Sequence, residues 1–111
     1  MKSSAVSDAK TVFWHRDLPP LEAEALDEHT VEVVSMRVPG RLAYRDEIWD
    51  RCYADLMTAA DARLNQEIAR LGGHFAHVLR ESVDSRRDDV AGEAWLRGRF
   101  TYVLYRRPIA A

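Results

Sequence analysis

The chain has 111 residues, 47% of them hydrophobic and 31% charged, which is the size and composition of a single globular domain. A formal net charge of -2 provides no overall attraction to nucleic acid or anionic membranes, and the only cysteine, Cys52, excludes an intrachain disulfide. No stretch approaches the roughly 18 apolar residues that span a bilayer, and the N-terminus lacks the apolar core of a signal peptide. We therefore expect a cytoplasmic protein with no membrane partner. The excess of arginine over lysine is typical of GC-rich bacterial genomes.

The first part of the chain divides into two segments. Residues 1–11 are small and polar and predict a flexible N-terminus. Residues 12–28, the N-terminal arm, contain two adjacent aromatic residues, Phe13 and Trp14, ahead of a proline pair. Aromatic side chains are costly to leave in water, so we expect the arm to cover an apolar surface of its own chain or a neighbour. From Leu21 the arm fits either one helical turn or an extended lead-in.

Residues 29–108 predict a single α+β domain. Its first strand, over residues 30–38, is rich in β-branched valines. Val31 and Val33 share one parity, whereas Val34, Met36 and Val38 share the other. Either a bulge near Val33 brings all of them to one face, or the strand is apolar on both faces.

An amphipathic helix follows, starting at Asp46 as its N-cap and ending at Gly72, which suits a left-handed cap. It covers about 26 residues, or ~39 Å at 1.5 Å per residue. Its apolar face is predicted to comprise Trp49, Cys52, Tyr53, Leu56, Ala60, Leu64 and Leu71. Its remaining surface is predicted to comprise mainly Arg51, Asp55, Asp61, Arg63, Gln66, Glu67 and Arg70.

Two further strands are predicted, over residues 74–85 and 94–106, joined by a turn over residues 86–92. In the last strand the even-numbered side chains from Ala94 to Leu104 are expected to meet the helix. The resulting prediction is a β-α-β-β order, with a three-stranded antiparallel sheet packed on one long helix and Pro108 ending the domain.

Three segments carry a resemblance to known proteins: Val31–Ser35 before the helix, Arg70–Val78 at its end, and Leu96–Val103 in the last strand. With this element order, the chain resembles the small bacterial dodecin, YbjQ-like and YdgH-like proteins over about residues 29–107. The resemblance implies a sheet wrapped on one helix and a tendency to assemble into rings or shells. Dodecins bind flavin between aromatic side chains, but no motif of this chain matches that site, so the resemblance implies no cofactor.

Histidine and cysteine give no strong sign of chemistry. His74 and His77 lie three positions apart, so on a regular strand they face opposite sides, and they are weak metal candidates. Cys52 lies on the apolar helix face and is interpreted as a core residue. An enzyme using His15, His74 or His77 for acid-base catalysis stays open, but no spacing requires it, and we expect no catalytic residue.

The last strand offers the best candidate interface. Trp95, Arg97, Arg99 and Tyr105 lie on its outer face, and aromatic and arginine side chains are enriched at protein interfaces. We expect a homo-oligomer that assembles through this face, with Trp14 of the arm as an anchor. Nucleic acid is an unlikely partner, since Arg99 stands where an RNA-binding strand requires an aromatic residue.

The alternative is a binder of a small, flavin-like aromatic ligand. Its site would lie between helix and sheet or at a subunit boundary. The stacking candidates are Trp49, Tyr53, Trp95 and Tyr102.

Overall fold

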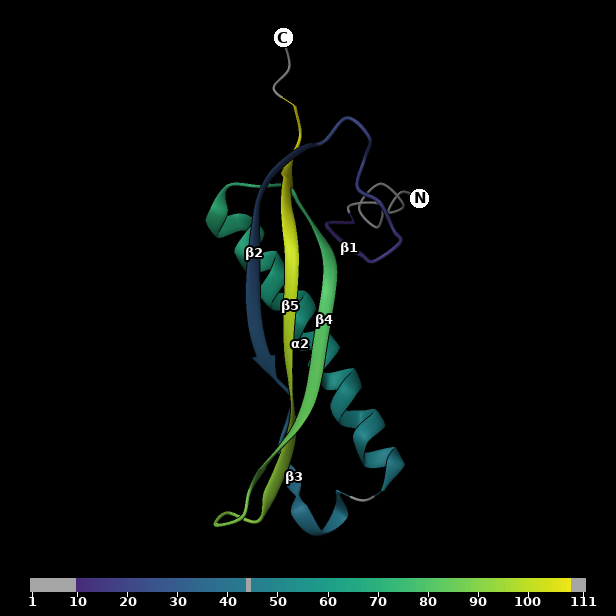
Figure 1. Ribbon diagram of the computed structural model, residues 1–111, viewed down its shortest axis with the longest axis vertical. Coiled ribbons are helices and arrows are strands. Elements are labelled where there is room, and N and C mark those ends of the chain that lie inside the picture. Colours follow the sequence, from purple (N-terminus) through teal and green to yellow (C-terminus); the bar gives the residue numbers. More distant parts are fainter. Residues whose placement is uncertain (1–9, 44, 109–111) are drawn as a thin grey trace, which may run out of the picture.

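The computed structural model describes residues 10–43 and 45–108 and is an α+β fold with one long helix on one face of a sheet (Figure 1). The predicted flexible N-terminus lies largely outside these residues. The elements in chain order are β1 (Val12–Trp14), β2 (Glu24–Val34), β3 (Val38–Pro39), the 3₁₀ turn η1 (Gly40–Leu42), α2 (Asp46–Leu71), β4 (Phe75–Asp88) and β5 (Glu93–Arg106).

The sheet is five-stranded and mixed, with the order β1-β4-β5-β2 and β3 pairing with β5. The three predicted strands, β2, β4 and β5, are antiparallel as expected. The predicted β-α-β-β order and three-stranded sheet omit β1 and β3, and β1 makes the sheet mixed. β1 is parallel to β4, with Val12 opposite Ala76 and Trp14 opposite Val78. Strands of two or three residues carry too little periodic pattern to be recognised in a sequence. In β1, Val12 is buried, whereas Phe13 and Trp14 are partly buried and meet Phe75 of β4 and Phe100 of β5.

β2 starts within the predicted N-terminal arm. Residues 21 and 22 form a turn in which Ala23 N–H donates to Pro20 O at 3.0 Å, and the strand begins at Glu24. Its bulge lies between Ala25 and Glu28, not near Val33. From Glu28 onward the register is continuous, so β2 presents an apolar residue to each face, with Val31 buried and Val34 52% exposed.

α2 agrees with the predicted helix in length and in its C-terminal cap. Gly72 has φ 76°, and Gly73 N–H donates to Ile68 O at 2.9 Å. The N-cap is Arg45, and Asp46 is the first helical residue, where its charge suits the positive end of the helix dipole. The prediction that Asp46 caps the helix is therefore wrong by one position.

β4 and β5 form a long twisted hairpin at the centre of the fold (Figure 1). The predicted turn over residues 86–92 is too long, because pairing continues to Asp88 opposite Glu93. The carboxylate of Asp88 accepts hydrogen bonds from the Val90 and Ala91 N–H groups at 3.0 and 3.1 Å, which closes a short loop.

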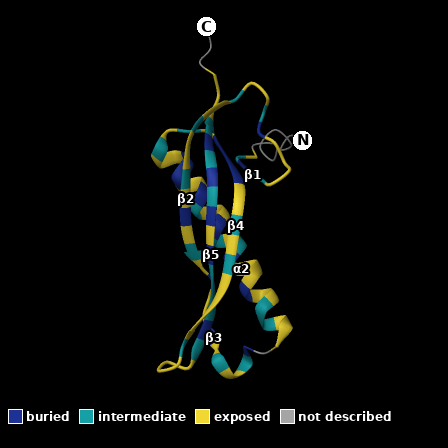
Figure 2. Cartoon of the chain, in the orientation of Figure 1, coloured by how far each residue is buried: buried dark blue, intermediate teal, exposed yellow. Residues whose placement is uncertain are grey.

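The core lies between α2 and the sheet, visible as the dark-blue segments in Figure 2. As predicted, the even-numbered side chains of β5 face α2, and Phe100 and Tyr102 are fully buried. The main cluster comprises Val12, Val31, Leu56, Ala60, Leu64, Ile68, Ala76, Val78, Phe100, Tyr102 and Leu104. A smaller cluster near the start of α2 comprises Val38, Ala43, Cys52 and Ala94.

The N-terminal arm packs on its own chain. The Trp14 ring meets the Phe100 ring edge-on at 5.7 Å between centroids, and Phe13 meets Phe75 at 5.9 Å. Trp14 is thus an intramolecular anchor on the helix side of the sheet.

Gly98 of β5 is a point of tight packing between the sheet and α2. A Cβ atom there would lie 2.7 Å from Phe100 Cε2 and 3.0 Å from Leu56 Cδ2. We expect Gly98→Ala to lower the free energy of unfolding by about 1–3 kcal/mol, as overpacked cores do. Urea denaturation measures this change, with Ser82→Ala on the exposed edge of the same sheet as control. Equal stability of Gly98→Ala and wild type would contradict the tight packing.

Candidate functional site

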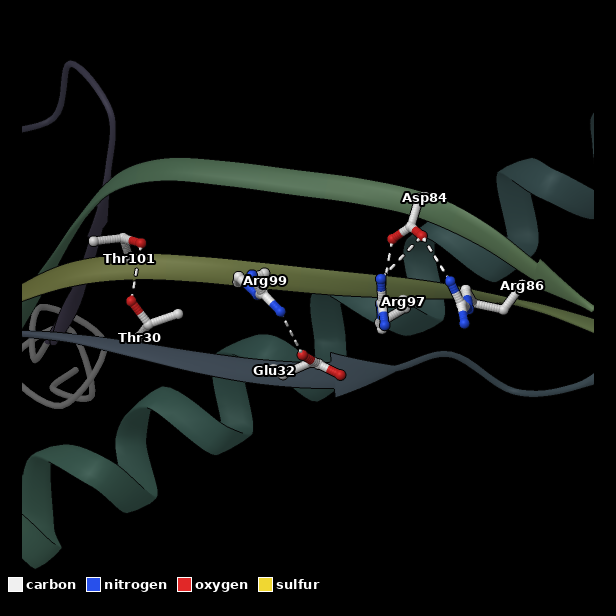
Figure 3. Close-up of polar contacts among 7 residues, drawn as sticks. All are labelled: Thr30, Glu32, Asp84, Arg86, Arg97, Arg99 and Thr101. Atoms are coloured by element: carbon white, nitrogen blue, oxygen red, sulfur yellow. Dashed lines mark hydrogen bonds and ion pairs between the residues drawn. The ribbon is translucent and has the colours of Figure 1, made fainter.

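The sheet face directed away from α2, here called the open face, carries a row of paired polar side chains across β2, β4 and β5 (Figure 3). Arg99 Nη2 of β5 lies 3.3 Å from Glu32 Oε1 of β2. The Thr101 and Thr30 hydroxyls of the same two strands lie 3.1 Å apart. These contacts follow from register, since Glu32 is opposite Arg99 and Thr30 is opposite Thr101.

A second group of charges crosses from β5 to β4. Arg97 Nη2 lies 3.2 Å from Asp84 Oδ2, and Arg86 Nη1 lies 3.6 Å from the same oxygen (Figure 3). The Asp84 side chain is 46% exposed, so these pairs are hydrated and each stabilises the monomer by at most about 1 kcal/mol. Each cation in this row is therefore already paired with a carboxylate of the same chain.

Both ends of the open face are covered by residues of the same chain. At one end, the Arg37 guanidinium stacks on the Trp95 ring at 3.8 Å from its centroid. At the other end, Tyr105 borders a hollow of about 160 Å³ together with residues 18–21 and Ala23 of the N-terminal arm. Of the predicted interface residues, Arg97 and Arg99 therefore lie at the accessible centre, and Trp95 and Tyr105 lie near its ends.

The predicted stacking residues do not converge on one site. Trp49 lines a hollow of about 310 Å³ with Ser85, Arg86, Arg87 and Ala94, between the start of α2 and the hairpin. Tyr53 lies further along α2, Trp95 belongs to the open face, and Tyr102 is fully buried in the core. In this hollow the Trp49 ring lies beside two cationic side chains, Arg86 and Arg87.

A cluster of titratable groups links the N-terminal arm to β4 and α2. His15 Nε2 lies 2.8 Å from Glu81 Oε1, and the Tyr53 hydroxyl donates to Glu81 Oε2 at 3.0 Å. Burial, followed by the hydrogen bond to Glu81, raises the pKa of Tyr53. His15 has φ 54°, a left-handed conformation that is uncommon for a residue other than glycine. Sequence reasoning missed this cluster, because the pairing of β1 with β4 joins residues far apart in the chain.

His74 and His77, the two weak metal candidates, each have a hydrogen-bond partner of their own. His74 Nδ1 accepts a hydrogen bond from the Arg107 backbone N–H at 2.9 Å. His77 is buried, and its Nε2 lies 2.6 Å from the backbone oxygen of His15. Across residues 10–43 and 45–108 no group of three or more His, Cys, Asp or Glu side chains is placed to hold a metal ion.

A buried carboxylate lies at the edge of the core. Glu67 of α2 is 8% exposed, so its predicted position on the outer surface of the helix is wrong. Arg70 Nη2 donates to Glu67 Oε1 at 2.6 Å, and Arg63 Nε donates to Oε2 at 3.3 Å. The hydrogen bond from Arg70 is the main reason that the pKa of Glu67 is lowered, against the opposing effect of burial. Helical periodicity assigns a charged residue to the outer surface. It cannot show that Arg63 and Arg70 pair with Glu67 and so allow its carboxylate to lie at the edge of the core.

Near this carboxylate lies a hydroxyl without a partner. The Tyr102 hydroxyl is fully buried and has no hydrogen bond within the described part of the chain. Burial raises the pKa of Tyr102, and the nearby charge of Glu67 adds to the effect. The ring packs against His29 at 5.7 Å between centroids.

Comparisons with known proteins give no relative. No family model matches the chain, and no curated protein or solved structure matches it either. The resemblance to dodecin, YbjQ-like and YdgH-like proteins stays a prediction. None of the helices in the described ranges is both long and apolar enough to cross a membrane.

The orphan hydroxyl makes a stability prediction. Tyr102→Phe removes a buried polar group without a partner and preserves the ring, so we expect an unchanged or higher free energy of unfolding, by up to about 1–3 kcal/mol. Urea denaturation measures the difference. A loss of more than about 1 kcal/mol would show that the hydroxyl has a partner, such as a buried water.

The buried carboxylate makes a pH prediction. A lowered pKa in the folded state means that ionised Glu67 stabilises the fold above its unfolded pKa, about 4.3, and that this contribution disappears as the pH falls through the folded value. Glu67→Gln should therefore lower Tm most near neutral pH, and the difference from wild type should shrink as the pH falls below about 4.3 and through the lowered folded pKa. Thermal melts at each pH test this, with the exposed Glu22→Gln as control. A constant difference would contradict the assignment.

Proposed function

We propose that this protein functions as a self-associating module, in which the open face of one chain packs against the open face of a second copy. The observation that carries the proposal is the composition of the uncovered centre of that face. This centre holds two ion pairs, Arg97 with Asp84 and Arg99 with Glu32, beside the threonine pair, and no described element of the chain covers it.

Charge arrangement supports a second copy as the occupant. A two-fold pairing brings each surface against itself, so every cation needs an anion within the same patch. Arg99 and Glu32 are adjacent on neighbouring strands, so a rotation about an axis between them presents each to the opposite charge. Charges already paired within the monomer also lose less hydration on burial than isolated ones.

The covered ends of the open face define the area for contact. Arg37 shields the Trp95 ring, and the arm lies beside Tyr105, so neither aromatic residue is a freely exposed anchor. The contact between the two open faces therefore depends more on the central charges than on Trp95 and Tyr105. Val34, 52% exposed on the open face, supplies apolar area beside Arg97.

Reversing one charge tests this arrangement. Arg99→Glu places two carboxylates side by side with Glu32 on each copy, so we expect the open-face contact to be lost and the solution mass to fall below that of the wild type. Light scattering at several concentrations measures the mass. The double variant Glu32→Arg/Arg99→Glu restores the pair in opposite orientation and should recover the wild-type mass.

The matched control is Arg51→Glu, an equal charge change at an exposed position of α2. It should leave the mass unchanged. A wild-type monomer at all concentrations, or an Arg99→Glu variant of unchanged mass, would overturn the proposal.

A further inference from the structure

The outer edge of β4 already accepts a strand along part of its length. Ala76 N–H donates to Thr11 O at 2.9 Å, and His15 N–H donates to Val78 O at 2.8 Å. The left-handed conformation of His15 then turns the chain away from the sheet. From Leu79 to Asp88, no strand of the described residues pairs with this edge, as the long lower part of the hairpin shows in Figure 1.

The two edges of the sheet differ in charge. β2, the opposite edge, carries Glu24, Asp27, Glu28 and Glu32, so two copies of it would bring carboxylates together. The open part of β4 instead mixes both signs: its charged residues are Arg80, Glu81, Asp84, Arg86, Arg87 and Asp88. A strand edge whose charges all have one sign repels a second copy of itself. An edge that carries both signs can pair with a second copy when opposite charges meet.

We propose that the free part of β4 pairs antiparallel with the same segment of a second copy, about a two-fold axis at Asp84. In this register Arg80 lies opposite Asp88 of the second copy, and Glu81 lies opposite Arg87. Each of these pairs occurs twice and joins opposite charges. The second copy's β4 ends opposite Arg80, two residues beyond Val78, where β1 pairs with the first copy.

Backbone direction agrees with this register. Leu96 O accepts a hydrogen bond from Ser35 N–H on the β2 side, so the even-numbered backbone groups of β5 point toward β2 and the odd-numbered ones toward β4. The β4 residues opposite the odd-numbered positions are even-numbered, such as Asp84 opposite Arg97. The odd-numbered residues of β4 therefore direct their N–H and C=O groups outward. The register pairs Glu81 with Arg87 and Val83 with Ser85, which joins outward-directed groups throughout.

The two-fold axis places the Asp84 side chains of the two copies opposite each other, so their carboxylates repel. Each Asp84 carboxylate is held by Arg97 and Arg86 of its own chain. The two carboxylates are therefore accompanied by guanidinium groups from both copies, which offsets their repulsion. This edge is distinct from the open face, so the inference stands whether or not the open faces pair.

A disulfide at the axis tests the register. Residues directly opposite in a non-hydrogen-bonded antiparallel pair have Cα atoms about 4.5 Å apart, within the range for a disulfide. We expect Asp84→Cys to form a covalent dimer under mild oxidation, measured by non-reducing electrophoresis at low protein concentration. Cys52 is buried and is common to all variants.

Two control variants, each with one introduced cysteine, distinguish the proposed register from random collision. Ser82→Cys is offset from its own copy by four residues, about 13 Å, and should stay monomeric on the gel. Val90→Cys lies at the fully exposed hairpin tip, away from the axis, and should also stay monomeric. Equal cross-linking of all three variants would overturn the proposal, as would no cross-linking by an Asp84→Cys variant whose thermal melt shows a folded protein.

The same cross-link in the Arg99→Glu background separates the two surfaces. Persistence of the Asp84→Cys dimer when the open face carries the reversed charge assigns the cross-link to the β4 edge. Its loss there, with the fold intact, would show that open-face packing brings the cysteines together and would overturn the edge pairing.

Discussion

The packing of β5 against α2 is the contact on which the other elements depend. Phe100 and Tyr102 are fully buried against Leu56, Ala60 and Leu64, and β5 is also the strand to which β2, β3 and β4 all pair. Gly98 lets the helix approach this strand, because any side chain there would overlap Phe100 and Leu56. Once β5 is fixed in this way, its odd-numbered residues must face away from the helix, and that alternation creates the open face.

The N-terminal arm completes the sheet and couples its parts. β1 adds to one edge, Trp14 reaches Phe100 on the helix side, and residues 18–21 pass beside Tyr105 on the other side. His15 ends β1 and contacts Glu81, which in turn binds Tyr53 of α2. A segment without regular periodicity therefore determines how much of the open face and of the β4 edge remains accessible.

Charge has different roles in different parts of this molecule. At the edge of the core, Arg63 and Arg70 hold Glu67 beside an apolar cluster, where the low dielectric makes the pairing important to the fold. On the open face the pairs are hydrated and contribute little to the monomer, so their order matters mainly for what the surface accepts. On β2 the charges have a single sign and oppose strand addition, whereas the free part of β4 carries charges of both signs.

The sequence by itself determined the long helix, its left-handed cap at Gly72, the β4–β5 hairpin and the face of β5 that meets the helix. These features arise from local periodicity over many residues, which is strong enough to be recognised without tertiary information. Only the tertiary structure decided the parallel pairing of β1, the early start of β2, the burial of Glu67 and the His15–Glu81–Tyr53 cluster. Each depends on contacts between residues distant in the chain or on strands too short to have a period. The separation of Trp49, Tyr53, Trp95 and Tyr102 into different environments has the same cause, since a sequence lists aromatic residues but only packing decides which of them meet.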